Sequence, residues 1–213
     1  MDADEVERFK RSTRILHWTV AVSAIVLAVT GMCFFVNAWG FVAEDSYTRV
    51  IHRVAAVVLM VAPVLYFAIH AKNSLKFLKD AFVWDKDDWK WLKKAPDYYF
   101  GGDPKGMPPQ NHINTGQKAF WLVCILCSVG FMISGLIMWT TGTNGAGGFL
   151  WAAIIHDLCL IVGGAMVVLH VYLGAMHPKM TESLHSMVTG KASVEYVEEH
   201  HKKWYKKEVV GKG

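Results

Sequence analysis

The stretch 149-FLWAAIIHDLCLIVGGAMVVLHVYLGAM-176 decides the fold of this chain. Its 28 residues carry a single charged side chain, Asp157. A helix needs about 20 predominantly apolar residues to cross the hydrocarbon core of a bilayer, because each residue adds about 1.5 Å along the axis. This stretch therefore predicts a membrane-spanning helix.

Three more stretches lack Asp, Glu, Lys and Arg. Residues 15–36 and 119–140 are 22 residues long each, and residues 54–69 are 16 residues long. The last of these reaches spanning length only when Ile51 and His52 are included, and we expect Pro63 to kink it. The chain is thus predicted to be all-α, an integral membrane four-helix bundle in one domain over 1–213, with spans at about 15–36, 49–70, 117–140 and 149–176, a loop at 71–116 and a tail at 177–213.

The composition agrees with a membrane protein. Apolar residues make up 53% and charged residues 19% of the 213 residues, against about 45–50% and 25% in ordinary globular chains. The net charge of +4 lies in flanking segments, which favours a membrane surface over nucleic acid as the partner. No cleavable signal peptide is expected, because a charged segment precedes the first apolar stretch. The four cysteines all lie in apolar stretches, which argues against a disulfide framework: Cys33, Cys124, Cys127 and Cys159.

Lysine and arginine gather on one side of the predicted spans. Four precede the first span, nine lie between the second and third, and seven follow the fourth, which is 20 of the 22 basic residues. The other two, Arg49 and Arg53, lie at the opposite end of the second span. By the positive-inside rule, both termini and the long loop are predicted to be cytoplasmic.

The long loop contains two contrasting segments. Residues 80–94, DAFVWDKDDWKWLKK, place aromatic residues among charges. This pattern predicts an amphipathic helix, either at the membrane interface or on a partner. Residues 96–111 are rich in Pro and Gly and are predicted to be irregular. No internal repeat is evident.

Four histidines lie at two depths of the predicted bundle. His17 and His170 lie at the cytoplasmic side, and His52 and His156 lie at the outer side. His156 and His170 are 14 residues apart, which is about 21 Å along a helix, and their side chains point within about 40° of each other. A haem takes one axial nitrogen from each face, so each histidine needs a partner on another helix. The pattern predicts two b-type haems, bound without covalent links because the chain has no C-x-x-C-H motif.

Other interpretations of the histidines stay open from spacing alone. His70 lies 18 residues after His52, five helical turns, and could replace His17 as the inner ligand. Zinc favours three or four ligands at one depth, and a proton relay usually includes acids, of which Asp157 is the one within a span. The chain could also be a membrane anchor with structural histidines, or a transporter.

Arginines and glycines in the spans have two possible roles each. Arg49 and Arg53 bracket His52 and could pair with haem propionates, or could serve orientation at the interface. Glycines in the spans allow close approach of helices or of a porphyrin, with helix packing the expected use of most: Gly31, Gly130, Gly135, Gly163 and Gly164.

Five motifs give the chain a resemblance to a known family. RILHW (14–18), TRVIH (48–52), IIH-x13-HVYLGAM in the fourth span, NTGQK (114–118) and EHHKKWYKKE (199–208) resemble the cytochrome b (gamma) subunit of membrane-bound respiratory formate dehydrogenases. The match covers nearly the whole chain. The histidine pattern is shared with the di-haem cytochrome b subunits of hydrogenase and thiosulfate reductase, and the last two motifs favour formate dehydrogenase.

The resemblance implies a role for particular residues. His52 and His156 would ligate the outer haem iron, and His17, in preference to His70, would ligate the inner iron with His170. A quinone, menaquinone or ubiquinone, would bind beside the inner haem at Asn114, Gly116 and Gln117. The alternative for NTGQK is a helix start with Asn114 or Thr115 as N-cap. Asp157 and the proline-rich segment before the third span depart from the family pattern.

The resemblance also implies partners and a location. An iron–sulfur subunit, fed by a molybdenum- or tungsten-containing catalytic subunit, would deliver electrons to the outer haem. The chain would then be an electron-transfer subunit of an oxidoreductase complex, without a formate-oxidising site of its own. It would lie in the bacterial inner (cytoplasmic) membrane, in contact with lipid and without nucleic acid.

Overall fold

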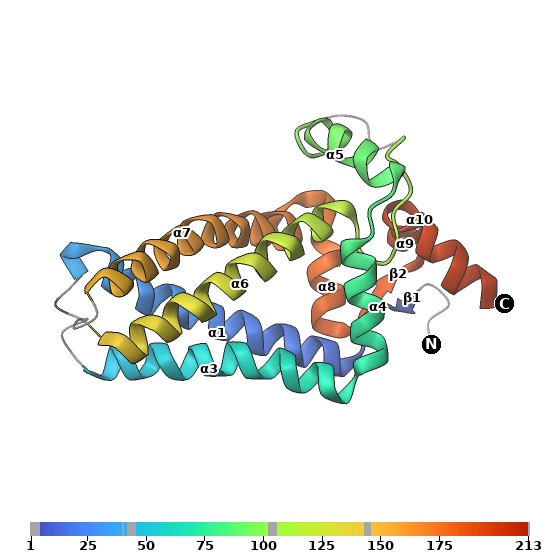
Figure 1. Ribbon diagram of the computed structural model, residues 1–213. Helices are drawn as coiled ribbons and strands as arrows, with labels where there is room; N and C mark the ends of the chain where they lie inside the picture. Colours follow the sequence, from blue (N-terminus) through green and yellow to red (C-terminus); the bar gives the residue numbers. More distant parts are fainter. Residues whose placement is uncertain (1–4, 40, 42–45, 102–105, 143–145, 213) are drawn as a thin grey trace. The chain divides into compact units, whose positions relative to one another are not determined.

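Four long helices dominate the computed structural model, which describes residues 5–39, 41, 46–101, 106–142 and 146–212. Each is long and apolar enough to cross a membrane, and each leaves large apolar side chains exposed, such as Leu126 and Val168 at 70%. Outward-facing apolar side chains suit a lipid environment, where backbone groups must bond within the helix. The predicted four spans are confirmed as α1 (Arg11–Phe35), α3 (Ser46–Ile69), α6 (Thr115–Thr141) and α7 (Ala146–Val171) (Figure 1).

The second span reaches full length in the way its sequence suggests. Its helix begins at Ser46, well before the charge-free stretch, and continues through Pro63 to Ile69. The fourth span is continued by a π-helical turn over Tyr172–Met176. The short connections between paired spans contain residues 40, 42–45 and 143–145, which lie outside the described residues.

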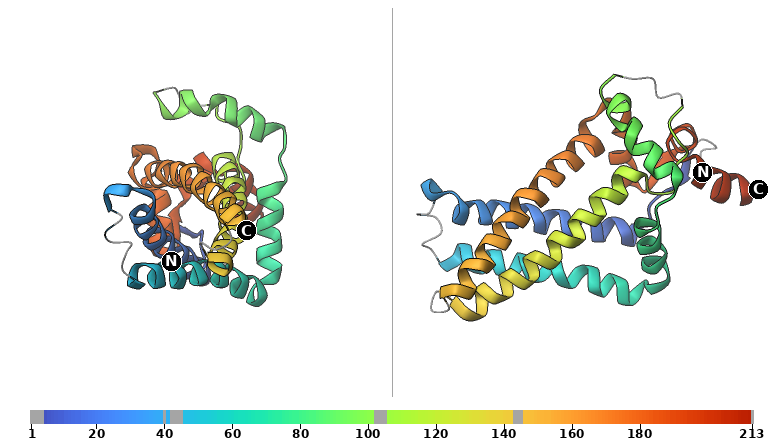
Figure 2. Two further views of the ribbon diagram at one scale, coloured as in Figure 1. Left: turned by 60° about the vertical axis from the view of Figure 1, so that its left-hand side comes forward. Right: turned by 45° about the horizontal axis from the view of Figure 1, so that its top comes forward.

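One compact unit comprises residues 11–74 and 124–168, and holds most of the four long helices (Figure 2). The hydroxyl groups of Thr13 and Tyr66 join α1 to α3 at 2.9 Å. The Arg53 guanidinium lies over the Trp139 ring of α6 at 5.1 Å. A Cβ on Gly130 would lie 2.5 Å from the Cys159 sulfur, so only glycine allows α6 and α7 to approach this closely.

The other unit comprises residues 1–10, 75–123 and 169–213, of which the termini are only partly described. Strand β1 (Glu5–Glu7) pairs antiparallel with β2 (Lys191–Ser193). Between α7 and β2 lies α8 (Thr181–Thr189), which ends at Gly190 with φ 95°. After β2 follow α9 (Val194–His200) and α10 (Lys202–Trp204). A small core joins both ends of the chain: Val6, Ala192, Tyr196, Val197, Trp204 and Tyr205.

The long loop folds into two helices, α4 (Ala71–Phe82) and α5 (Lys86–Tyr99). The prediction of one helix across residues 80–94 is therefore wrong. The Asp85 carboxylate accepts the N–H groups of Asp87 and Asp88, and the Asp88 carboxylate accepts the N–H of Asp85, which starts a new helix.

Helix α5 also corrects the irregular segment predicted from Pro96 onward. Its last turn contains Pro96, so irregular backbone begins only after Tyr99. Residues 102–105, with Lys105 among the basic residues counted for orientation, lie outside the described residues. The buried face of α5 packs on this chain through Trp91 and Tyr98, while contact with lipid or a partner stays a prediction.

Candidate cofactor sites

Two of the predicted ligand histidines meet inside the bundle. The ring centres of His52 on α3 and His156 on α7 are 6.3 Å apart, with their planes at 50°. Two imidazoles on opposite sides of one metal, each bonded at about 2 Å, have ring centres about 6 Å apart. The spacing therefore fits a single metal ion between the two rings.

Hydroxyl groups on the neighbouring helices orient both rings. Thr30 Oγ1 lies 2.7 Å from His52 Nδ1, and Ser134 Oγ lies 2.9 Å from His156 Nδ1. Each hydroxyl donates its own proton to a backbone carbonyl four residues earlier, at 2.7 Å for Thr30 and 2.6 Å for Ser134. Each must therefore accept from the imidazole Nδ1–H. This leaves the Nε2 lone pair of both histidines for a metal.

Glycine leaves space beside both rings. A Cβ on Gly31 would lie 3.6 Å from His52 Cε1, and one on Gly135 would lie 3.5 Å from His156 Cε1. A longer side chain at either position would run along the imidazole, where a porphyrin edge must pass. The residues present therefore fit a haem at the outer depth. By contrast, a Cβ on Gly164 would meet nothing within 4 Å among the described residues.

The two halves of this site repeat each other, which corrects the expectation that the chain has no internal repeat. Thr30–Gly31 precedes His52 by 22 residues, counted from the threonine, and Ser134–Gly135 precedes His156 by the same interval. The hairpins α1–α3 and α6–α7 each supply one hydroxyl, one glycine and one histidine. Sequence reasoning missed Thr30 and Ser134, although the shared interval was visible in the sequence.

The donor set suits haem better than zinc. The described residues contain no group of three or more His, Cys, Asp or Glu side chains that could hold one metal ion. A zinc site needs three or four protein ligands at one place, whereas a porphyrin brings four nitrogens of its own.

The arginines near His52 have separate surroundings. Arg53 stacks on Trp139, as described above, and Arg49 is exposed. Neither position tests the predicted contact with propionates.

The inner histidines each lie against aromatic rings. His17 lies edge-on to Trp18 at 5.0 Å, and His70 lies 4.7 Å from the Tyr66 ring. The His170 ring stacks on Phe120 of α6 at 4.3 Å, with 12° between the planes. His17 and His170 belong to different units of the chain, so their pairing stays a prediction.

The segment NTGQK forms the start of α6, with Asn114 as its N-cap. Asn114 Oδ1 accepts the Gln117 N–H at 2.9 Å, and Gln117 Oε1 accepts the Asn114 N–H at 2.9 Å. The Thr115 N–H donates to Gln110 Oε1 at 2.7 Å. Among the described residues, the Gly116 N–H has no acceptor, and a Cβ there would lie 3.0 Å from the Trp91 ring.

This helix start can therefore still donate hydrogen bonds. Both side-chain oxygens are used by the backbone, which leaves the NH2 groups of Asn114 and Gln117 directed elsewhere. Phe120, which stacks on His170, lies one turn further along α6. The helix-start interpretation is correct, and it leaves the quinone interpretation open because only acceptors are used.

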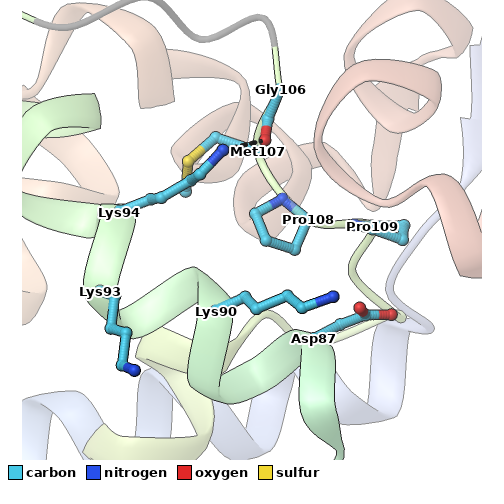
Figure 3. A pocket seen from close by; sticks show the side chains of 8 residues that line it. All are labelled: Asp87, Lys90, Lys93, Lys94, Gly106, Met107, Pro108 and Pro109. Atoms are coloured by element: carbon cyan, nitrogen blue, oxygen red, sulfur yellow. Dashed lines mark hydrogen bonds between the residues drawn. The ribbon is translucent and has the colours of Figure 1, made fainter.

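A cationic hollow lies along α5. It encloses about 410 Å³ and is lined by three lysines and the segment from Gly106 to Pro109. Figure 3 shows Lys94 turned toward the Gly106 carbonyl, to which it donates at 2.9 Å, while Lys93 points away from Met107. None of the predicted cofactor residues lines this hollow.

Comparison with known proteins agrees with the geometry. The family model of prokaryotic cytochrome b561 matches residues 8–190. The chain is 24% identical to the cytochrome b556(Fdn) subunit of the nitrate-inducible formate dehydrogenase of Escherichia coli (strain K12), over 94% of this chain and 90% of that protein. It is 22% identical to the formate dehydrogenase cytochrome b556 subunit of Haemophilus influenzae, over 96% of this chain and 84% of that protein. With four spans and a family model that covers most of its length, the chain belongs to the prokaryotic cytochrome b561 family.

Proposed function

We propose that this multi-pass membrane cytochrome b is the di-haem subunit of a formate dehydrogenase complex, which it anchors in the membrane and connects to a quinone. The observation that carries the proposal is the pair His52 and His156, 6.3 Å apart, each with Nδ1 held by a hydroxyl. The relatives named above are formate dehydrogenase subunits, which favours this donor over a hydrogenase.

At the outer depth, His52 and His156 are the axial ligands. When bound, haem b supplies a one-electron carrier whose potential depends on its ligands and their hydrogen bonds. Thr30 and Ser134 hold the two imidazoles in the tautomer that presents Nε2. Arg49 and Arg53, at the same end of α3, are the candidates for the propionates.

At the inner depth, His17 and His170 are the proposed ligands. His170 lies 14 residues after His156 on α7, and the stacked Phe120 ring restricts its rotation. His70 is the alternative partner in place of His17, because it lies at the same end of α3 as Tyr66. The two depths form a path along which electrons move from an iron–sulfur partner toward the cytoplasmic side.

Asn114, Gly116 and Gln117 are proposed to bind the quinone beside the inner haem. A quinone carbonyl accepts hydrogen bonds and gains negative charge on reduction, so it requires donors. The start of α6 offers the two side-chain NH2 groups and the Gly116 N–H. The positive end of the helix dipole adds to this preference.

The charge distribution supports an orientation for this reaction. With both termini in the cytoplasm of a bacterial inner membrane, the quinone site faces the cytoplasm and takes its protons there. The iron–sulfur subunit, fed by a molybdenum- or tungsten-containing subunit, would dock at the opposite face. Inward electron flow with inner proton uptake would build a membrane potential.

A haem count tests the proposal. The purified full chain is expected to show sharp b-type bands in a reduced-minus-oxidised spectrum, with two haems per chain by pyridine haemochrome assay. Absence of these bands after growth with ample haem supply would leave a structural anchor or a transporter instead. Parallel His17→Ala and His70→Ala variants assign the fourth ligand, because only the true ligand's loss removes the second haem.

A further inference from the structure

A buried carboxylate on α5 organises the start of α6. Asp88 is 3% exposed, and its Oδ1 accepts the Thr115 hydroxyl at 2.6 Å. Its Oδ2 accepts the Lys118 ammonium at 2.8 Å and the Asp85 N–H at 2.9 Å. Lys118 is 7% exposed and also donates to the Val83 carbonyl at 3.0 Å. Both charges are therefore paired inside the protein.

Stability alone is a poor reason for such a pair. Removing two charges from water costs about as much as their attraction returns, so the best-attested use of a buried ion pair is to fix one register between elements. Here the two elements are α5 and the first turn of α6. The other ion pairs of α5, Lys203 with Asp85 and Asp87, are more exposed.

The register fixed by this pair reaches the proposed quinone donors directly. Lys118 and Thr115 flank Gly116 and Gln117 in sequence, and both bond to Asp88. Trp91, one turn after Asp88, lies over Gly116 close enough that a Cβ there would be 3.0 Å from the ring. A shift of α5 would therefore move the wall above the Gly116 N–H.

We propose that Asp88 and Lys118 are positioning residues of the quinone site. They hold the first turn of α6 so that its three donors keep one arrangement as the quinone enters and leaves. The inference rests on the proposed quinone role of Asn114, Gly116 and Gln117. Because the pair touches neither histidine depth, its loss should weaken quinone binding and leave the haems unchanged.

The test uses the full haem-loaded chain in detergent, reduced with stoichiometric dithionite and mixed with menadione in a stopped-flow instrument. Haem reoxidation is followed at the α-band over a range of menadione concentrations. Asp88→Asn leaves Lys118 buried without its anion, and is expected to raise the half-saturating menadione concentration about tenfold. The limiting rate and the haem content should stay within about twofold of wild type.

A second variant removes the pair without leaving a buried charge. Asp88→Asn combined with Lys118→Met should raise the half-saturating concentration about threefold, less than the single variant does. Lys76→Met is the matched control, because it removes an exposed pair with Glu208 on the same unit and should change nothing. If the single variant does not accumulate, the double variant decides alone.

The outcomes separate this inference from the quinone proposal beneath it. If Asn114→Ala and Gln117→Ala leave the half-saturating concentration unchanged, the quinone site itself is wrong. If those variants raise it while the Asp88 variants match wild type, only the positioning role is overturned. A fall in limiting rate and haem content without a change in half-saturation would also overturn it, since that is the signature of a general structural defect.

Discussion

At the end of the bundle where His52 and His156 meet, the hairpins α1–α3 and α6–α7 present the same residue types at the same interval, whereas at the other end they differ. The interval between equivalent residues is 104, from His52 to His156. By that interval Trp121 on α6 corresponds to His17, and Tyr66 on α3 corresponds to His170.

The difference suits two kinds of ligand. Equivalent hydroxyls, glycines and histidines on two hairpins can hold one permanent group between them from both sides. Where the equivalence is lost, the freed positions carry aromatic residues with other contacts: Trp121 lies 4.8 Å from Phe77, and Tyr66 bonds to Thr13. A quinone must come and go, and an asymmetric end can offer it one open side.

Removing one half of the symmetric site should give the largest effect. His156→Ala deletes one axial ligand, so the outer haem should be lost and the haem count should fall from two per chain to one. A pyridine haemochrome assay with spectra of the remaining haem measures this. His185→Ala, a partly exposed histidine outside the spans, is the control and should retain both haems. Two haems in the His156 variant would rule out the proposed pairing.

Filling the space beside a ligand should come next. Gly135→Val places methyl groups next to the His156 ring, where a Cβ alone already lies 3.5 Å from Cε1, and should lower outer-haem occupancy several-fold. Gly164→Val makes the same change on α7, where a Cβ meets nothing within 4 Å, and should keep full occupancy. Equal occupancy in the two variants would mean that no porphyrin edge passes Gly135.

The bundle was predictable because lipid acts on every residue of a span. Stretches without charge gave four helices close to their observed bounds, and the distribution of basic residues gave the depths at which His52 and His156 were expected to share a level. The quinone segment was also recognised as a helix start, since Asn114 is a favoured N-cap residue.

The details that were missed depend on packing between distant segments. A serine or threonine in a span usually bonds to its own helix, so nothing local indicates that Thr30 and Ser134 also accept from a histidine. The buried partnership of Asp88 with Lys118 joins residues 30 positions apart within a loop that looks amphipathic throughout. Only the folded chain brings these groups together.

The two hydroxyls provide a subtler test of the symmetry. Thr30→Val and Ser134→Ala each leave an imidazole Nδ1–H without its acceptor, which makes the ligand less basic and favours the reduced iron. Each should raise the midpoint potential of the outer haem by tens of millivolts, since one hydrogen bond contributes about 1 kcal/mol. A redox titration of the α-band measures the shift. Shifts of opposite sign would show that the hairpins are not equivalent here.

The smallest effect concerns the packed tail outside the symmetric site. His201 donates to the Asn111 carbonyl at 2.6 Å and accepts from the Arg8 guanidinium at 2.9 Å, so it is neutral. Burial, and then the charge of Arg8, hold the pKa of His201 well below its ordinary value of 6.5, and burial also lowers the pKa values of His112 and His200.

Acid should therefore loosen the tail before it affects the bundle. Below pH 6.5 the released tail binds protons that the packed tail excludes, so the packing free energy falls as the pH drops from 6.5 toward the lower pKa values. Limited proteolysis of residues 191–212 should accelerate between about pH 7.5 and pH 5.5 while the α-band of the outer haem stays constant. Replacing His201 with Gln, which keeps one donor and one acceptor, should flatten this dependence. A tail equally resistant at both pH values would mean that these histidines do not control its packing, and that the two ends of the chain are held chiefly by the apolar contacts of Val6, Ala192 and Val197.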